Sequence, residues 1–209
     1  MIQLITPDRY DEFTDALTEM HRLRYRVFKE RLGWEVETAG DMEMDEFDAL
    51  RPAYLLLRGH DGQVRGCVRL LPSCGPTMLG ETFPALSPNG PILGTPDIWE
   101  SSRFALDIQR DAEIGNQGVA ISTYKLFAGM VEFGLARSLS KILTVTDVRM
   151  ERILRRAAWP LDRLGSARQI GKTSAVAGYL AVSQEVLHSL RRLGGFKGPV
   201  LWAPVVQAA

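Results

Sequence analysis

The chain has 209 residues, of which 45% are hydrophobic and 24% charged, and its formal net charge is zero. This length and composition are typical of a globular chain with a real hydrophobic core and exclude a disordered one, so we expect residues 1–209 to form a single domain. Because the net charge is zero, any binding of nucleic acid would require a local basic patch.

The N-terminal half begins with a predicted helix followed by a hairpin. Residues 9–31 carry apolar side chains at spacings of three and four, which is helical periodicity, and Gly33 follows as an expected C-cap. An irregular acidic stretch comes next, at 34–51. Two strand-like runs at 53–58 and 63–71, with a turn signal between them, predict a β-hairpin.

The C-terminal half alternates strands and helices. A stretch rich in Pro and Gly at 71–96 is expected to be a long surface loop. The remaining elements are predicted in the following order: a strand at 98–106, a helix at 118–139, a strand at 142–146, helices at 150–158 and 174–193, and a strand at 199–203. This order favours an α/β fold with a mixed sheet flanked by helices and right-handed crossovers in its parallel part.

Cysteines, histidines and apolar runs indicate the compartment and the metal content. Cys67 and Cys74, with no signal-peptide pattern at the N-terminus, predict a reducing, cytoplasmic location. No apolar run approaches the roughly 20 residues that span a membrane. We therefore expect no membrane association. The histidines have no ligand spacing with the cysteines, so we also expect no metal site.

Several charged residues occupy positions where charge is unusual. Arg24 interrupts the apolar stripe of the first helix, and Glu100 and Arg103 lie inside the strand-like run WESSRF. Charges in such settings need a partner or a ligand. Others are near the hairpin: Asp45, Asp48 and Arg69. On spacing alone, a structural ion-pair network and a substrate site are equally good interpretations, and core packing is the simpler interpretation of the nearby Phe28 and Trp34.

Five segments resemble those of autoinducer synthases (LuxI-type acyl-homoserine-lactone synthases): HRLRYRVFKERLGWEVE, EMDEFDAL, GCVRLLP, GPTMLGETFPAL and IWESSRFAL. The resemblance is strong over residues 1–160 and loose beyond them. The family's recurrent Arg, Phe, Trp, Asp, Asp, Arg, Glu and Arg match, in order, Arg24, Phe28, Trp34, Asp45, Asp48, Arg69, Glu100 and Arg103. The resemblance implies a GNAT-like three-layer sandwich with a mixed sheet, in agreement with the element order.

The resemblance also implies an acyltransferase that makes a quorum-sensing signal in two steps. The α-amine of S-adenosylmethionine attacks the thioester of an acyl donor, either acyl-CoA or acyl carrier protein. The methionine carboxylate then displaces the sulfonium, which closes the homoserine lactone and releases methylthioadenosine. S-adenosylmethionine is a substrate in this reaction, so the resemblance implies no separate cofactor.

The carboxylates suit the handling of the amine. A free α-amine has a pKa near ~8, so a proton must leave before or during the attack. Glu100 is the first candidate for the base, directly or through a water molecule. Asp45 or Asp48 can hold the ammonium beforehand, and which carboxylate or water is the general base stays open.

The aromatic and basic residues suit the rest of S-adenosylmethionine. Aromatic faces attract a sulfonium, which suits Phe28 and Trp34. Arg24 or Arg103 can hold the substrate carboxylate by a bidentate pair, whereas Arg69 is expected to brace the acidic loop. The oxyanion donors are expected to be backbone N–H groups at an irregular strand.

Two further features concern the acyl side. The strand around Thr144 and Thr146 resembles the family segment that lines the acyl pocket, where a threonine can bond a 3-oxo group, and Phe83 and Phe104 are further candidates; all four are equally typical of a core. A basic stretch at 149–172 has seven basic and two acidic residues. Its candidates for docking an acyl carrier are Arg149, Arg152, Arg156, Arg163, Arg168 and Lys172. An exposed helix face with no docking role is an equally good interpretation of this basic stretch.

Two other functions compete with this interpretation. A GNAT-type N-acetyltransferase acting on another amine would use acetyl-CoA, but the glycines of RDAEIGNQG at 110–118 do not match the spacing of a pyrophosphate loop. A binding module would use the basic stretch, but no nucleic-acid recognition motif is present. The acyl group, the donor and the oligomeric state stay open.

Overall fold

The computed structural model describes residues 1–107 and 112–202. Within them, nine strands form one mixed sheet: β1 (Ile2–Ile5), β4 (Ala53–Arg58), β5 (Val64–Pro72), β6 (Ile98–Leu106), β7 (Lys141–Asp147), β8 (Asp162–Arg163), β9 (Arg168–Ile170), β10 (Thr173–Ala181) and β11 (Leu201–Trp202). The strand order is β11-β1-β4-β5-β6-β7-β10-β8, and β9 also pairs with β10. A separate two-stranded ribbon is formed by β2 (Thr38–Ala39) and β3 (Met42–Glu43).

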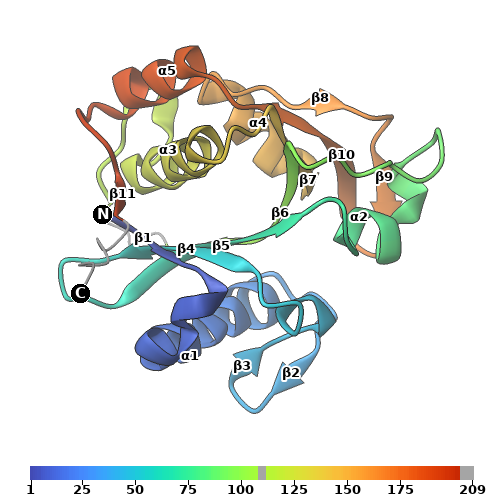
Figure 1. Ribbon diagram of the computed structural model, residues 1–209, viewed down its shortest axis with the longest axis horizontal. Helices are drawn as coiled ribbons and strands as arrows, with labels where there is room; N and C mark the ends of the chain where they lie inside the picture. The colour runs from blue at the N-terminus through green and yellow to red at the C-terminus, as the bar shows by residue number, and fades with distance from the viewer. Residues whose placement is uncertain (108–111, 203–209) are drawn as a thin grey trace.

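Helices cover both faces of the sheet, as Figure 1 shows. One face carries α1 (Thr14–Arg24), and the other carries α3 (Ile121–Ala136), α4 (Val148–Arg156) and α5 (Gln184–Gly194). The predicted three-layer α/β arrangement with a mixed sheet is therefore confirmed. The larger apolar core lies under α3, and a second one lies under α1. No helix of the described residues is long and apolar enough to cross a membrane.

The sheet forks between β6 and β7, which run parallel. The two strands pair from Ile98 with Lys141 to Ser101 with Thr144, and no pairing between them is present beyond that point in the described residues. β6 continues to Leu106 on β5 alone. The fork therefore exposes strand edges in the middle of the sheet, where a ligand can approach the backbone.

The predicted helix at 9–31 consists of three parts with different winding. A 3₁₀ segment η1 (Pro7–Phe13) leads into α1, and a π-helical segment η2 (Tyr25–Arg31) continues it. Single π-turns inserted in helices often mark functional sites, because the extra residue per turn re-aims the side chains. Gly33 adopts a φ of +64°, as expected for a residue that ends a helix.

The hairpin and the strand at 98–106 match the predictions closely, but the helix predicted at 174–193 is wrong over its first half. That half is the strand β10, and α5 begins only at Gln184 with Ser183 as its N-cap. β10 is covered on both faces, so its apolar run shows no alternation and periodicity does not identify it. Gly178 permits the close approach of β8, because a Cβ there would lie 2.5 Å from the Asp162 carbonyl oxygen.

The stretch at 71–96 is only partly the surface loop that was predicted. It contains the short helix α2 (Met78–Glu81) and a 3₁₀ turn η4 (Pro84–Leu86), and Leu79 and Leu86 are buried against β7 and β10. The final strand predicted at 199–203 is β11, parallel to β1, and residue 203 lies outside the described residues. Glu132 of α3 holds this strand by accepting the backbone N–H groups of Val200 and Leu201.

Candidate active site

Six charged side chains of the described residues meet between the α1 face of the sheet and the acidic segment. We call them the ion network: Arg24, Glu43, Asp45, Asp48, Arg69 and Arg103. The three arginines come from the end of α1, from β5 and from β6. The others come from β3 and from the 3₁₀ turn η3 (Glu46–Asp48), whose N-cap is Asp45. Three guanidinium groups face three carboxylates, so the network is balanced in charge.

Arg24 is fully buried, and all three of its guanidinium nitrogens donate hydrogen bonds. Its Nη1 and Nη2 donate to Asp48 Oδ1 and Oδ2 at 2.8 and 2.9 Å, and its Nε donates to Glu43. Burial alone would lower the pKa of Arg24, but the hydrogen bonds and charges of Asp48 and Glu43 raise it above the usual value. Burial likewise opposes ionisation of Asp48, yet Arg24 and Arg69 hold its pKa well below the usual range. Both groups therefore stay charged.

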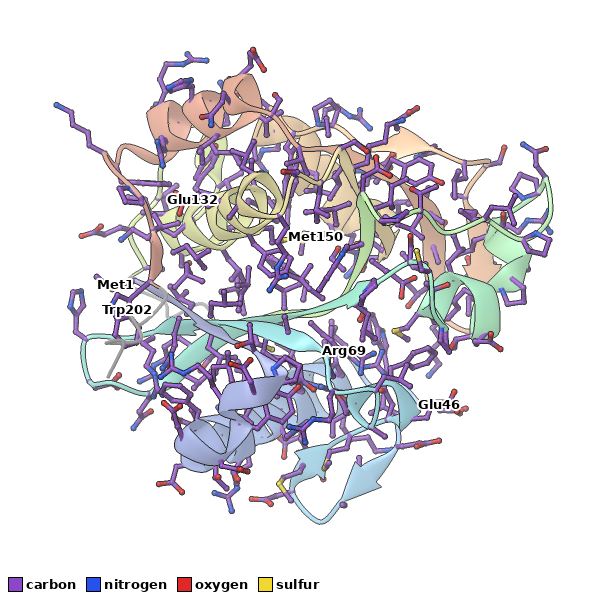
Figure 2. All side chains as sticks on the ribbon, viewed as in Figure 1. Met1, Glu46, Arg69, Glu132, Met150 and Trp202 are labelled. Carbon is purple, nitrogen blue, oxygen red and sulfur yellow. The ribbon has the colours of Figure 1, made fainter. Side chains whose placement is uncertain are left out.

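Arg69 joins the acidic turn to the sheet. Its Nη1 and Nη2 donate to Asp45, the latter at 3.0 Å, and Nη1 also donates to Asp48 Oδ1 at 2.9 Å. Its Nε donates to Ser102 Oγ on β6 at 2.9 Å. Figure 2 shows Arg69 on the α1 side of the sheet and Met150 on the opposite side. The position of Arg69 is that of the brace expected from the sequence.

Arg103 reaches the network from an irregular point of β6. The register against β5 shifts between Cys67 and Arg69, and Arg103 has a φ of +53°. Its Nε donates to Glu43 Oε1 at 2.8 Å, and its Nη2 lies 2.7 Å from Asp45 Oδ2. Burial lowers the pKa of Arg103 while Glu43 and Asp45 oppose that shift, and the guanidinium remains a cation at neutral pH.

An aromatic pair adjoins the network. Phe28, carried by the π-helical segment, stacks on Trp34 with ring centroids 5.3 Å apart and an interplanar angle of 8°. The Trp34 backbone N–H donates to the Phe28 carbonyl at 2.9 Å, which fixes the pair. The Arg103 guanidinium lies 5.7 Å from the centre of the Phe28 ring. Phe28 is buried and Trp34 half-buried, so Trp34 offers the accessible aromatic surface.

Glu100 lies outside the network and is almost completely buried. Its Oε2 accepts the Met78 backbone N–H at 2.7 Å, and its Oε1 accepts that of Leu79 at 2.9 Å, at the start of α2. Burial raises the pKa of Glu100 above that of an ordinary carboxyl, although these two hydrogen bonds and Arg69 oppose the shift. Glu100 is thus a carboxyl suited to hold or release a proton closer to neutral pH.

A small apolar cavity of about 50 Å³ occupies the fork on the other face of the sheet. We call it the fork cavity, and its lining is Ser101, Ser102, Arg103, Phe104, Phe127, Met130, Thr144, Val145, Thr146, Met150, Leu154 and Leu180. Three of the four predicted acyl-pocket residues line it. Phe83 does not, because it packs beside Phe47 and Leu71 in another cluster near α2. The Thr144 hydroxyl donates to the Ser101 carbonyl at 3.2 Å.

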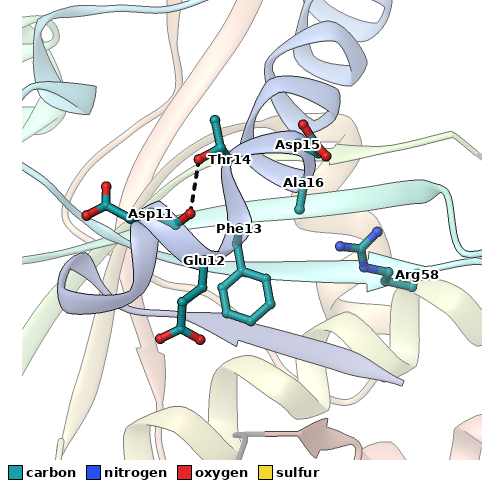
Figure 3. A pocket seen from close by; sticks show the side chains of 7 residues that line it. All are labelled: Asp11, Glu12, Phe13, Thr14, Asp15, Ala16 and Arg58. Carbon is teal, nitrogen blue, oxygen red and sulfur yellow. Dashed lines mark hydrogen bonds between the residues drawn. The ribbon is translucent and has the colours of Figure 1, made fainter.

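A larger hollow of about 220 Å³ lies elsewhere, at the beginning of α1 (Figure 3). It is lined by Asp11, Glu12, Phe13, Thr14, Asp15, Ala16 and Arg58. None of the residues predicted for the site belongs to it, and three of its seven lining residues are acidic. No group of three or more metal-binding side chains is present among residues 1–107 and 112–202.

The predicted docking residues are only partly available. Arg163 is paired with Glu151, with both hydrogen bonds at 2.5 Å, and Arg156 donates to the Gln117 carbonyl. All six candidates are exposed, and the other four are Arg149, Arg152, Arg168 and Lys172. The exposed Arg149 and Arg152 lie on α4, the helix that also supplies Met150 and Leu154 to the fork cavity. Residues 110 and 111 of the glycine-containing stretch at 110–118 lie outside the described residues.

Sequence reasoning missed several contacts of the site. Glu43 is completely buried and links Arg24 to Arg103, and the His21 ring Nδ1 lies 3.0 Å from its carbonyl oxygen. Tyr54 donates to Asp48 Oδ1 at 2.5 Å. In the sequence, Glu43 is one acid among many in the acidic stretch, so only its ion pairs distinguish it.

Comparisons with known proteins agree on one family. The sequence profile of the autoinducer synthases matches residues 8–190. The acyl-homoserine-lactone synthase of Agrobacterium fabrum is 39% identical over 208 residues, covering 100% of this chain and 99% of that protein. The crystal structure of the synthase LasI, 35% identical, aligns with a TM-score of 0.80 over 91% of this chain and 93% of that one.

A second solved structure shares the fold at lower identity. The CoA-dependent synthase BjaI, described with S-adenosylmethionine and isopentyl-CoA, is 25% identical and aligns with a TM-score of 0.84 over 97% of this chain and 92% of that one. These matches confirm the expected GNAT-like sandwich. With this fold, the near full-length identity and the profile match, the chain belongs to the autoinducer synthase family and is an acyl-homoserine-lactone synthase.

Proposed function

We propose that this synthase binds S-adenosylmethionine at the ion network and receives the acyl thioester through the fork between β6 and β7. One observation carries the proposal: the ion network and the fork cavity lie on opposite faces of the sheet and share the β6 segment 101–104. An amine on one face and a thioester on the other therefore meet at the same backbone. The structure of BjaI with S-adenosylmethionine and isopentyl-CoA supports the choice of these two kinds of substrate.

The amine side is built for a substrate of mixed charge. S-adenosylmethionine carries an ammonium, a sulfonium and a carboxylate. Trp34 offers an aromatic face to the sulfonium, Asp45 a partly exposed carboxylate to the ammonium, and Arg103 a guanidinium to the carboxylate. The polar atoms of Arg24, Arg69 and Asp48 are occupied by partners inside the site, so the proposed role of these residues is to hold the other three groups in place.

Glu100 is the proposed base. Each of its carboxylate oxygens accepts one backbone N–H, and each oxygen has a second lone pair for an incoming proton or water. Its raised pKa lessens the mismatch with an α-amine of pKa near ~8. The deprotonated amine attacks the thioester carbonyl carbon, the C–S bond breaks, and the thiol leaves with a proton. The substrate carboxylate then attacks the carbon next to the sulfonium and expels methylthioadenosine.

The thioester carbonyl is proposed to lie against the irregular part of β6. A bulge interrupts the ladder and leaves backbone groups without a strand partner, which suits N–H donors to a developing oxyanion. The acyl chain then enters the fork cavity. The Thr144 hydroxyl already donates its hydrogen to the Ser101 carbonyl. We therefore assign to Thr146 the hydroxyl that donates to an oxygen on the acyl chain.

The exposed basic residues of α4 are proposed to receive the carrier of the acyl group. Arg149 and Arg152 lie on the helix that supplies Met150 and Leu154 to the fork cavity, and their charge suits the phosphates of coenzyme A or an acidic carrier protein. Replacing Arg152 by Glu should raise the KM for the carrier several-fold at low salt and less at high salt. Arg192→Glu, the same charge reversal at an exposed arginine of α5, is the matched control and should have no such effect.

The deciding experiment is mass spectrometry of the products made by the purified protein. S-adenosylmethionine is supplied with matched pairs of acyl-CoA and acyl-carrier-protein thioesters. We expect an acylated homoserine lactone and methylthioadenosine in equal amounts, and the faster member of each pair identifies the donor. Acylation of another amine, with S-adenosylmethionine untouched, would instead assign the protein to generic N-acetyl transfer.

A further inference from the structure

The bulge in β6 decides where Arg103 points. On β5, one residue separates Cys67 from Arg69, whereas their partners on β6, Ala105 and Ser102, have two residues between them. In a regular strand successive side chains alternate between faces. Here Ser102 and Arg103 both point to the α1 face, since Ser102 Oγ accepts from Arg69 and Arg103 Nε donates to Glu43. In a regular strand that kept Ser102 on the α1 face, Arg103 would face α3.

The bulge is conformationally costly. Arg103 adopts a φ of +53°, in the left-handed region that residues with a side chain avoid. Such a conformation persists only where its surroundings hold it. The Arg103 side chain is held by Glu43 and Asp45, and its carbonyl, turned out of the regular ladder, needs a partner as well.

Cys67 supplies that partner. Its Sγ lies 3.5 Å from the Arg103 carbonyl oxygen, with the thiol as donor. The side chain is 1% exposed, and burial raises the pKa of the thiol to about 12, so the thiol keeps its hydrogen at neutral pH. An apolar side chain at position 67 could fill the same space but could not donate a hydrogen bond to the Arg103 carbonyl.

We propose that Cys67 is a positioning residue, whose thiol hydrogen bond to the Arg103 carbonyl holds the β6 bulge and so aims the Arg103 guanidinium at the substrate. This inference rests on the proposed role of Arg103 in binding S-adenosylmethionine. Cys67 thus affects substrate affinity without contacting the substrate.

The test compares four variants of the full chain. Cys67→Ala removes the donor, Cys67→Ser keeps one, Val68→Ala removes buried volume from the same strand, and Cys74→Ala removes the exposed thiol. We expect Cys67→Ala to raise the KM for S-adenosylmethionine about 2- to 10-fold, the range for one lost hydrogen bond, with an unchanged KM for the thioester. Cys67→Ser should return towards the wild-type value.

Amide hydrogen exchange gives a readout that does not depend on activity. The backbone amides of residues 102–105 should exchange faster in Cys67→Ala than in Val68→Ala at matched thermal stability. Equal exchange in these two variants, or an equal rise in both KM values, would overturn the proposal and leave Cys67 a packing residue. A wild-type protein that makes no lactone would overturn the proposed function instead, while the exchange measurement still tests the bond.

Discussion

The two sides of the β6 strand are built from opposite kinds of side chain. On the α1 side, the ion network holds its charged groups by multiple hydrogen bonds, with Arg24, Glu43 and Arg69 fully buried. On the α3 side, the fork cavity is small, apolar and partly walled by two methionines, Met130 and Met150. Paired buried charges tolerate little displacement, whereas methionine side chains repack readily.

This difference indicates how the two substrates are selected. A fixed arrangement of charges suits a substrate that does not vary, and S-adenosylmethionine is proposed for that side. A repackable apolar cavity suits an acyl group whose length can change with few substitutions. Substitutions on the α1 side should therefore abolish activity or stability, and substitutions in the fork cavity should redirect it.

The largest effect is expected from Asp48→Ala. The change leaves Arg24 and Arg69 buried with a lost partner, which should cost about 3–5 kcal/mol of unfolding free energy, measured by urea denaturation. Asp41→Ala, at an exposed ion pair with Arg22, is the control and should cost about 0–1 kcal/mol. A loss for Asp48→Ala no greater than that of the control would show that the network is not rigid.

The same residue predicts a pH dependence of stability. Because the folded-state pKa of Asp48 lies below the unfolded value, its contribution is present above about pH 4 and is lost as the pH falls towards the folded pKa. Wild-type unfolding free energy should therefore decline below about pH 4. The decline should be shallower in Asp48→Ala, in which this carboxylate no longer titrates.

Glu100→Gln should reduce turnover strongly. It should also cost about 1–3 kcal/mol of unfolding free energy, because the amide nitrogen of glutamine cannot accept the second of the two backbone N–H groups. If Glu100 is the base, kcat should fall about 10²- to 10⁴-fold while the KM for S-adenosylmethionine changes little. The rising limb of the wild-type pH profile should lie above the ordinary carboxyl pKa of about 4.3, because burial raises the pKa of Glu100, and the variant should lack this limb. Glu81→Gln, on the exposed side of α2, is the control.

An equal fall in turnover and substrate affinity would give Glu100 another role. In that case its hydrogen bonds to the Met78 and Leu79 amides would be its main function, and it would anchor α2 over the site.

Trp34→Ala tests the aromatic contribution to S-adenosylmethionine binding on the α1 side. Loss of its face should raise the KM for S-adenosylmethionine about 2- to 30-fold, corresponding to about 0.5–2 kcal/mol, and should change kcat less. Trp34→Phe should retain part of the affinity. Trp202→Ala, at an exposed tryptophan on β11, is the control. An unchanged KM in Trp34→Ala would remove this residue from the site.

The smallest effect on overall rate, and the most informative on specificity, is expected from Met130→Ala. Enlarging the fork cavity should shift the preference towards longer acyl chains, by about 4-fold in kcat/KM for each added methylene, corresponding to about 0.8 kcal/mol. Leu126→Ala, buried on the same helix but outside the cavity lining, should lower stability without changing the preference. An equal shift in acyl-chain preference in both variants would show that the fork cavity does not determine the length of the acyl chain.

Local patterns in the sequence determined much of this protein. Alternation and turn residues located the hairpin β4–β5 and the strand β6, and helical spacing located α3 and α4. The family resemblance selected Arg24, Asp45, Asp48, Arg69 and Arg103, which the structure brings into one network. These features depend on residues close in the chain or on a motif that is itself local.

Tertiary structure decided the rest. β10 has no alternation because neighbouring elements bury both of its faces, so only the sheet identifies it as a strand. Glu43 became a central residue through pairing with Arg24 and Arg103, 19 and 60 positions away. The orientation of Arg103 depends on a bulge, which exists only in the register of β6 against β5. Such contacts join distant parts of the chain, and no periodicity within a single segment records them.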